Sequence, residues 1–471
     1  MESMTAASRP LLDIPGTVAA LRASFDAGTT LGIDGRLEAL AALRRGIVAE
    51  RSALERALAE DLGKSTQEAT VTEIGVVLAE IDHMRRHLRS WLRPGRFGLG
   101  AVLAPGSGHV LREPLGTVLV IAPWNYPVNL ALSPLVGAIA GGNTALLAPS
   151  ELAPATSAAL ARLAARHLDP AWIRVVEGGV EEKTALLAER FDLIFYTGGG
   201  RVGRLVAHAA AEHLTPTVLE LGGKSPVFVD EGVDLARAAR RIVWGKFTNA
   251  GQTCTAPDHL MATPATLAAL LPHLRAAIEE MYGPDPRTCE EYGRIVGEAQ
   301  LDRLAGLLDG ATAAIGGVDG IDRAARHIPP TVLVDVSFDD PVMDEEIFGP
   351  ILPLLAVSGP LEAVDRIRAG AKPLTAYVFS DDPRTRRLFA TRTSSGSLAL
   401  GLTLAHVGAV SMPFGGVGES GHGAYHGRAS LEAFTHAKPV VSKPLVPDTL
   451  RLVYPPVSAL RRRLVRRLLG G

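Results

Sequence analysis

The stretch that decides the fold runs from Asp192-Leu-Ile-Phe-Tyr-Thr197 through Gly198-Gly-Gly-Arg-Val-Gly203 into residues 204–214. The first part has the apolar, aromatic character of a buried strand, the second matches the pattern G-x-G-x-x-G, and the third has helical periodicity. Glycines at such a turn let the backbone approach a ligand, and the positive end of the helix dipole can face a phosphate. The pattern therefore predicts a nucleotide site, although glycine-rich turns are also common as purely structural features of α/β proteins. Its candidate contacts are Gly198, Gly199, Gly200, Arg201, Val202 and Gly203.

The sequence on either side of this stretch alternates in the same way. From Leu111 onward, short β-rich runs such as TVLVIAP, NTALLAP, IRVVEG and PVFV are separated by helical segments. That alternation is typical of βαβ units around a parallel sheet. Apolar residues at three- and four-residue steps predict helices over roughly the first ninety residues, with Gly63 at a helix C-cap. After residue 222 a second α/β unit follows, so we expect an α/β protein whose two units share a cleft.

The composition excludes several classes of protein. The chain has 471 residues, of which 47% are hydrophobic and 21% are charged, with 48 basic against 50 acidic side chains. A disordered chain would be apolar-poor and strongly charged, and a nucleic-acid-binding protein of this kind would carry a large positive excess. Only two cysteines are present, Cys254 and Cys289. They exclude a disulfide framework and favour a reducing, cytoplasmic setting.

Only the C-terminus contains a segment for which membrane contact is an alternative. Residues 1–16 contain no continuous apolar core, so no signal peptide is expected. The uncharged stretch 114–150 is interrupted by prolines and asparagines, which favours a buried core over a membrane span. Residues 458–469 read SALRRRLVRRLL, a basic amphipathic helix with leucines at 460, 464 and 468. We expect these leucines to pack on the protein itself, with peripheral contact to an anionic membrane as the alternative.

Three residue settings could carry chemistry. Cys254 lies in Gly251-Gln-Thr-Cys254-Thr, where small and polar neighbours would let a thiolate nucleophile be approached, although a lone cysteine is more often buried and inert. Glu220 lies at a strand end just before a double glycine. It could be a general base aimed into a cleft, or an ordinary surface carboxylate. It also lies at the right distance from the glycine turn to bind a ribose. Asn125 lies between two prolines, where its amide could stabilise an oxyanion or simply close a turn.

Other settings are predicted to be inert. Cys289 has charged neighbours and no comparable surroundings. His422 and His426 are four residues apart, but their segment is too rich in glycine for a regular helix and no third ligand is evident. We therefore predict no metal site.

The order of these motifs is far more specific than any one of them. Seven occur in sequence, and together with Cys254-Thr-Ala-Pro-Asp258 they resemble the aldehyde dehydrogenase superfamily, in particular its class 3 branch, over roughly residues 30–445. The seven are Pro123-Trp-Asn-Tyr-Pro127, Pro149-Ser-Glu151, Phe195-Tyr-Thr-Gly198, Glu220-Leu-Gly-Gly-Lys224, Gly251-Gln-Thr-Cys254, Glu345-Glu-Ile-Phe-Gly-Pro350 and Pro413-Phe-Gly-Gly416.

The resemblance implies oxidation of an aldehyde to its carboxylic acid. Cys254 would attack the aldehyde carbonyl as a thiolate, and Asn125 with the backbone N–H of Cys254 would hold the oxyanion. Transfer of hydride to the nicotinamide would leave a thioester, which water activated by Glu220 would hydrolyse. This assigns Glu220 to the general-base position rather than to a ribose. The apolar run at 398–410 favours aliphatic or aromatic aldehydes.

The resemblance also implies a set of cofactor contacts. Glu346 and Phe348 would position the nicotinamide ribose and ring. Glu151 would contact the adenosine ribose and repel a 2′-phosphate, which favours NAD over NADP. The full set is Trp124, Glu151, Gly198, Gly199, Gly200, Arg201, Val202, Gly203, Leu221, Gly222, Glu346 and Phe348.

The family fold implies two Rossmann-type α/β domains and a small bridging β element that builds homodimers. On this chain the NAD-binding domain would comprise residues 1–92 and 113–219, and the catalytic domain residues 220–427. The bridging element would comprise residues 93–112 and 428–446, and a basic tail would cover residues 447–471.

Three positions depart from the family pattern. Ala148 replaces a lysine that would bond the adenosine ribose, Gly199 replaces a common serine, and Leu400 replaces an asparagine. Loss of a charge-assisted hydrogen bond of about 1.5–3 kcal/mol would weaken cofactor binding about 10- to 100-fold. Two alternatives follow: a catalytically impaired binding or scaffold protein, and a cofactor-independent thiol esterase using Cys254.

Overall fold

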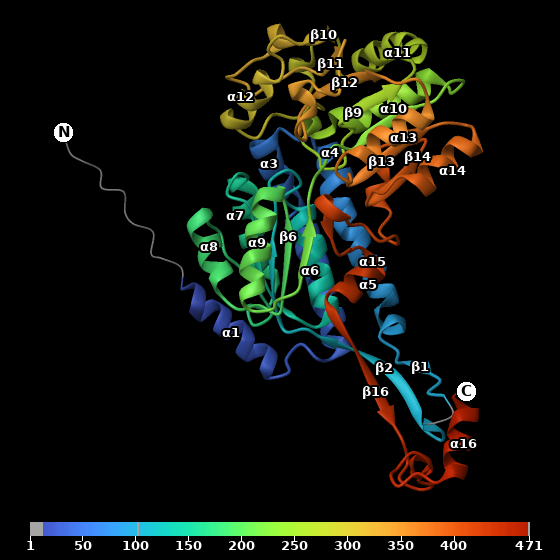
Figure 1. Cartoon of the computed structure of the whole chain (residues 1–471). Helices are drawn as coiled ribbons and strands as arrows, with labels where there is room; N and C mark the ends of the chain where they lie inside the picture. Colours follow the sequence, from blue (N-terminus) through green and yellow to red (C-terminus); the bar gives the residue numbers. More distant parts are fainter. Residues whose placement is uncertain (1–12, 101–102, 470–471) are drawn as a thin grey trace, which may run out of the picture.

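The structure is a computed structural model that describes residues 13–100 and 103–469. It contains three β-sheets, two of them covered by helices (Figure 1). The predicted α/β fold class is confirmed. The first twelve residues, for which no signal peptide is predicted, lie outside the described residues.

The first large sheet has six strands in the order β15-β7-β6-β3-β4-β5. All neighbours are parallel except β15, which pairs antiparallel with β7 and so adds residues 421–422 to a sheet formed otherwise by residues 117–220. The strands are β3 (Thr117–Ile121), β4 (Thr144–Ala148), β5 (Ile173–Val175), β6 (Leu193–Thr197), β7 (Thr217–Glu220) and β15 (Gly421–His422).

Alternate residues of strand β3 enter two different cores. Val118 and Val120 join the core formed with α2, α3, α5, α6, α7 and α15, while Leu119 and Ile121 join the core formed with α1, α8 and α9. This two-sided burial explains why the strands are apolar without interruption. The helices are α1 (Ile14–Asp26), α2 (Ile33–Ala49), α3 (Arg51–Leu62), α4 (Thr66–Ala69), α5 (Gly75–Trp91), α6 (Asn129–Gly141), α7 (Pro154–His167), α8 (Val180–Ala188), α9 (Gly200–Glu212) and α15 (Gly427–Ala433).

Helix α9 begins four residues earlier than the glycine pattern predicts. The N–H of Gly203 bonds to the carbonyl of Gly199 at 3.0 Å, so the helix already includes Gly200. Gly203 then packs on Leu221, where an added Cβ would lie 2.8 Å from a Leu221 methyl carbon. The third glycine of the pattern therefore serves close packing of the helix on the segment after β7, and the turn itself is confined to Gly198 and Gly199.

The second large sheet has seven strands in the order β10-β11-β12-β9-β8-β13-β14, parallel except for β10. Helices α10 to α12 contribute to the core on one face, while α13 and α14 contribute to the core on the other. The elements are β8 (Pro226–Val229), α10 (Leu235–Phe247), β9 (His259–Ala262), α11 (Pro264–Tyr282), α12 (Glu298–Gly306), β10 (Thr312–Ile315), β11 (Thr331–Val334), β12 (Ile351–Ala356), α13 (Pro360–Ala369), β13 (Thr375–Phe379), α14 (Pro383–Arg392) and β14 (Ser397–Leu400).

The third sheet is a small antiparallel arm that extends away from the two larger sheets (Figure 1). Its central strand β2 (Ser107–Pro114) pairs with β1 (Gly95–Phe97) on one side and β16 (Thr435–Ser442) on the other. These strands fall largely within the ranges expected for the bridging element.

The C-terminal helix α16 (Ala459–Leu468) lies beside this arm (Figure 1). The prediction that its leucines pack on the protein itself is wrong for the single chain, because the exposed fractions are 77% for Leu460, 42% for Leu464 and 44% for Leu468. Among the described residues no helix is both long enough and apolar enough to cross a membrane.

Candidate active site

The loop before Cys254 has an unusual backbone. Asn249, Ala250 and Gly251 all have left-handed φ angles, of 54°, 51° and 73°. Two of them carry side chains, which costs energy that the surroundings must offset. The Asn249 amide contributes by donating to the carbonyl oxygens of Asn125, at 2.8 Å, and Gln252, at 3.1 Å. At Gly251 a Cβ would lie 2.2 Å from the Gly349 carbonyl oxygen, so only glycine allows this approach.

This loop places Cys254 at the junction of two cavities. One cavity has a volume of about 200 Å³ and is almost entirely apolar. The other has a volume of about 250 Å³ and is more polar. Cys254 and Leu130 line both cavities, and the thiol is half-buried. A group on either side can therefore reach the sulfur.

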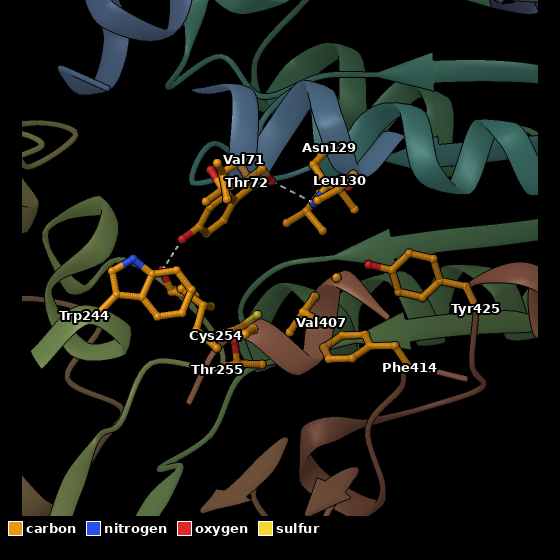
Figure 2. Close-up of a pocket in the computed structure, with 16 residues that line it drawn as sticks. Val71, Thr72, Asn129, Leu130, Trp244, Cys254, Thr255, Val407, Phe414 and Tyr425 are labelled. Carbon is orange, nitrogen blue, oxygen red and sulfur yellow. Dashed lines mark hydrogen bonds between the residues drawn. The ribbon is translucent and has the colours of Figure 1, made fainter. Parts of the chain in front are cut away.

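The apolar cavity lies between the two large domains. Figure 2 shows Cys254 and Thr255 on one side of it, Val71 and Thr72 opposite, Trp244 at one end and Tyr425 at the other. The large apolar side chains of its wall are Val71, Val76, Leu130, Trp244, Leu404, Val407, Phe414 and Tyr425. Among the described residues, no charged side chain lines it.

The polar cavity lies at the carboxyl ends of β3, β6 and β7, where ligands of open α/β sheets bind. It gathers most of the candidate residues: Trp124, Asn125, Gly198, Gly199, Glu220, Leu221, Gly222, Cys254, Glu346 and Phe348. Gln300 and Arg303 of α12 also line it, and the sequence gave no indication of them.

Five candidate cofactor contacts lie outside this lining. Gly200 lines an adjoining cavity of about 600 Å³, together with Gly222 and Glu346. Arg201 and Val202 are exposed on the first turn of α9, and Gly203 is buried against Leu221. The carboxylate of Glu151 forms an ion pair with Lys183 of α8, at the edge of the sheet.

Asn125 is buried and fixed from several sides. Its side-chain amide donates to the carbonyl of Gln252 at 3.0 Å, which leaves the second amide hydrogen for another acceptor. Its own carbonyl oxygen accepts from Lys64 at 2.9 Å and from Asn249 at 2.8 Å. The amide is therefore preorganised beside Cys254, as an oxyanion donor requires.

Glu220 ends strand β7 and is 3% exposed. Within the described part of the chain neither carboxylate oxygen has a hydrogen-bond partner. Burial raises the pKa of Glu220 well above its usual range. An unpaired buried carboxyl group is costly, and such groups concentrate at functional sites.

The thiol of Cys254 is held in its protonated form in this state. Burial, followed by the charges of Glu346 and Glu220, raises the pKa of Cys254 to about 12, while hydrogen bonds from the backbone N–H groups of Cys254 and Thr255 act in the opposite direction. Burial and the charge of Asp258 raise the pKa of Glu346 to about 8. The three acidic groups are thus coupled, and a proton on either carboxyl favours the thiolate.

Glu346 and Phe348 lie on one loop at the edge of the polar cavity. A Cβ on Gly222 would lie 2.0 Å from a carboxylate oxygen of Glu346, so the carboxylate packs directly on the backbone after Glu220. The ring of Phe348 meets that of Trp124 edge to face, with centroids 5.4 Å apart. The loop thus brings its two candidate cofactor contacts against the segments that carry Glu220 and Asn125.

The sequence did not reveal the buried support of this site. Lys64 is 1% exposed and lies 2.7 Å from Glu73, which is fully buried. A lysine and a glutamate nine residues apart in a helical region would ordinarily be solvent-exposed. A glycine C-cap directly before Lys64 and the short π-helical turn at Thr70–Ile74 are the local features that turn both inward.

Comparison with known proteins settles the family. The family model described as "Aldehyde dehydrogenase family" matches residues 5–440. "Aldehyde dehydrogenase family 3 member H1" of Arabidopsis thaliana is 42% identical over 457 residues, which cover 96% of this chain and 94% of that protein. The chain belongs to the aldehyde dehydrogenase family. It is an oxidoreductase of the class 3-like branch, and the reaction of its family is oxidation of an aldehyde to the acid.

Two further relatives extend the comparison. The rat "Aldehyde dehydrogenase, dimeric NADP-preferring" is 41% identical over 447 residues, which cover 95% of this chain and 98% of that protein. Among solved aldehyde dehydrogenases, "Substrate bound state of Staphylococcus Aureus AldH" superposes with a TM-score of 0.94 at 39% identity, covering 97% of this chain and 99% of that one. The alternative of a degraded scaffold protein is not favoured by this similarity.

Of the three positions that depart from the family pattern, only Gly199 lines a cavity at Cys254. Ala148 is buried at the end of β4, and Leu400 is exposed at the end of β14. Gly199 lines the polar cavity as the N-cap of α9. None of the three replaces a group that contacts Cys254 or Glu220.

Proposed function

We propose that this aldehyde dehydrogenase oxidises apolar aliphatic or aromatic aldehydes, with Cys254 as nucleophile, Asn125 as oxyanion donor and Glu220 as general base. The observation that carries the proposal is the position of the Cys254 thiol, at the junction of an apolar and a polar cavity. The apolar cavity has no charged side chain among the described residues that line it, and it suits the hydrocarbon part of a substrate. The polar cavity suits the nicotinamide end of a dinucleotide.

The residues present fit such a cofactor. Gly198 and Gly199 leave the N-terminus of α9 open to a phosphate, and Gly222 leaves room for Glu346 beside the cavity. Trp124, Leu221, Glu346 and Phe348 would hold the nicotinamide end. When bound, the nicotinamide supplies the hydride acceptor.

The chemistry of the chain's own residues follows from this placement. Once the Cys254 thiol has given its proton to solvent, the thiolate adds to the aldehyde carbon. The oxygen takes up negative charge that the free amide hydrogen of Asn125 and the N–H of Cys254 stabilise. Departure of hydride from that carbon leaves a thioester on Cys254. Glu220 then takes a proton from water as the water attacks the thioester, and the acid leaves as the thiol is restored.

The residues that would contact the adenosine ribose of the cofactor influence the choice between NAD and NADP. The carboxylate of Glu151 would bond a ribose hydroxyl and repel a 2′-phosphate, which favours NAD. Lys183 neutralises that carboxylate in the structure and weakens the discrimination. We therefore propose NAD as the preferred cofactor, with NADP accepted less well.

A homodimer formed through the small antiparallel arm is part of the proposal. Strand β16 spans Thr435–Ser442 and is the edge strand of a three-stranded sheet, so its outer edge is open to pairing. A rat relative carries the word "dimeric" in its name. The exposed leucines and the arginines of α16 favour additional contact with an anionic membrane surface. A reducing, cytoplasmic compartment would keep the Cys254 thiol free.

The proposal is tested by NADH or NADPH formation from purified protein with hydrophobic and charged aldehydes. Turnover of hydrophobic aldehydes that disappears in Cys254→Ala supports it. Turnover that persists in Cys254→Ala would refute the nucleophile, and a preference for charged aldehydes would refute the substrate class. Ester hydrolysis without cofactor, followed in parallel, shows whether the thiol acts independently.

A further inference from the structure

Lys224 and Asp258 form an ion pair next to the active site, with 2.5 Å between Nζ and Oδ2. Asp258 is 3% exposed at its side chain and Lys224 is 20% exposed. Lys224 lies four residues after Glu220, and Asp258 lies four residues after Cys254. The pair therefore joins the segment of the candidate base to the segment of the candidate nucleophile.

The same two side chains also hold the segment 342–348, which carries Glu346 and Phe348. The Lys224 ammonium donates to the carbonyl oxygens of Val342, at 3.1 Å, and Glu345, at 2.8 Å. The other carboxylate oxygen of Asp258 accepts the N–H of Ile347 at 2.9 Å. The anchored backbone groups of Glu345 and Ile347 lie directly before and after Glu346.

The backbone around the pair adds further links. The N–H of Asp258 donates to the carbonyl of Ser225 at 2.8 Å, which connects the two catalytic segments directly. Gly222 packs closely on Glu346, and Gly251 packs closely on Gly349 just after the segment, so there is little room for these residues to approach the catalytic segments. The ion pair of Lys224 and Asp258 restrains segment 342–348 from moving away from the catalytic segments.

The carboxyl group of Asp258 is ionised under all ordinary conditions. Burial opposes the charge on Asp258, but Lys224, His259 and Lys246 outweigh it and lower the pKa of Asp258 to about 2. Lys246 is a useful comparison, since it supplies a buried charge near Asp258 and Glu346 yet makes no hydrogen bond to segment 342–348 in the described structure.

We propose that Lys224 and Asp258 are positioning residues that set the nicotinamide contacts, Glu346 and Phe348, in register with Cys254 and Glu220. The inference rests on the proposed function, because it takes Glu346 and Phe348 as cofactor contacts. Neither Lys224 nor Asp258 touches the reacting atoms. Their effect is geometric, and small misplacements of reacting groups are enough to slow a reaction strongly.

The test separates cofactor-dependent from cofactor-independent chemistry of one thiol. In Lys224→Met we expect the KM for the cofactor to rise about 10-fold or more and aldehyde oxidation to slow, as for loss of charged hydrogen bonds. Hydrolysis of p-nitrophenyl acetate would use Cys254, Asn125 and Glu220 but no cofactor contact, and should stay within about 2-fold of wild type. Asp258→Asn, which keeps an acceptor for Ile347 but loses the charge, should show a smaller change of the same kind.

Controls make the result specific. Lys246→Met removes a buried positive charge nearby without removing a tether, and should leave the cofactor KM within about 2-fold. The double variant of Lys224 and Asp258 should be no worse than Lys224→Met if the two act as one unit. Melting temperatures show which variants are folded. If Lys224→Met is not folded, the Asp258→Asn variant provides the test in its place.

Two results would overturn the proposal: an unchanged cofactor KM in folded Lys224→Met, or an equal loss of ester hydrolysis and aldehyde oxidation. Failure of the proposed function itself would look different, because aldehyde oxidation would then persist in the Cys254→Ala variant.

Discussion

The Nζ atom of Lys64 lies 2.9 Å from the carbonyl oxygen of Asn125, with no access to solvent for the lysine side chain. The same ammonium lies 2.7 Å from Glu73. The second carboxylate oxygen of Glu73 accepts the N–H groups of Val128 and Asn129, at 3.1 and 2.8 Å, where α6 begins. One buried ion pair thus fixes both the candidate oxyanion donor and the start of the helix that follows it.

Replacing Lys64 by methionine should therefore impair both stability and catalysis. It leaves Glu73 charged and buried without its partner, a change that costs about 3–5 kcal/mol of folding free energy. In the folded fraction, kcat/KM for the aldehyde should fall about 100-fold as the oxyanion donor loses its position, while the cofactor KM changes little. Urea unfolding and steady-state kinetics measure the two effects. Glu73→Gln on the Lys64→Met background should restore stability without restoring kcat.

Glu220→Gln should separate the two halves of the reaction. Glutamine cannot take a proton from water, so the thioester on Cys254 should persist. We expect a burst of NADH of about one equivalent per site followed by slow turnover, measured by stopped-flow absorbance. Full steady-state turnover in this variant would exclude Glu220 as the base.

Glu346→Gln should make the Cys254 thiol more reactive. The negative charge of Glu346 is the largest contribution after burial to the raised pKa of Cys254, so its removal lowers that pKa. At a given pH above about 8, where Glu346 is ionised in wild type, more thiolate should be present in the variant. Below that pH the two proteins should converge, because Glu346 is then neutral in wild type.

The rate of iodoacetamide alkylation across pH 7–10 checks this expectation, each unit of pKa corresponding to about a tenfold change in rate. Glu345→Gln removes the neighbouring carboxylate and is the matched control. An alkylation profile that moves to higher pH in Glu346→Gln would contradict the assignment.

Lys183→Ala should change the choice of cofactor. Without Lys183 the carboxylate of Glu151 is no longer neutralised and repels a 2′-phosphate more strongly. We expect the ratio of kcat/KM for NADP over NAD to fall about 5- to 10-fold, which corresponds to about 1 kcal/mol between partly exposed charges. Lys183→Arg keeps the charge and should keep the ratio. A ratio that Lys183→Ala leaves unchanged would show that Glu151 lies too far from the 2′ position to matter.

Trp244→Ala should weaken selection for apolar substrates. The indole forms one end of the apolar cavity, and burying a large apolar side chain contributes about 1.5–3 kcal/mol. The kcat/KM for a long aliphatic aldehyde should therefore fall about 10- to 100-fold, with that for acetaldehyde nearly constant. Equal losses for both aldehydes would place the hydrocarbon part of the substrate elsewhere.

The sequence predicted the parts of the fold that depend on local patterns. The alternating strands and helices around Asp192–Gly203 were read correctly because strands buried on both faces form continuous apolar runs. The start of α9 was placed four residues too late, since glycines that begin a helix cannot be told from glycines in a loop by composition alone. The leucines of α16 were expected to be covered, because periodicity shows that a helix has an apolar face but not what lies opposite it.

At the site, the sequence named the residues that line the polar cavity but not those that support them. Cys254, Glu220 and Asn125 stand in glycine- and proline-rich settings that distinguish them. Lys64, Lys224 and Asp258 are charged residues in ordinary surroundings, and their burial depends on contacts with segments 61 to 121 residues distant in the chain. Such contacts leave no periodic signal.

The junction of the two cavities at Cys254 also has a consequence for inhibitor design. A compound with a hydrocarbon arm in the apolar cavity and a nicotinamide-like arm in the polar one could straddle the sulfur and gain affinity from both sides. Linking two modest binders in this way multiplies their affinities when the linker matches the span. Selectivity between related dehydrogenases would then come from the apolar arm, because that half of the junction is shaped by side chains such as Trp244 and Leu404, whereas Gly198, Gly199 and Gly222 form part of the lining of the other half.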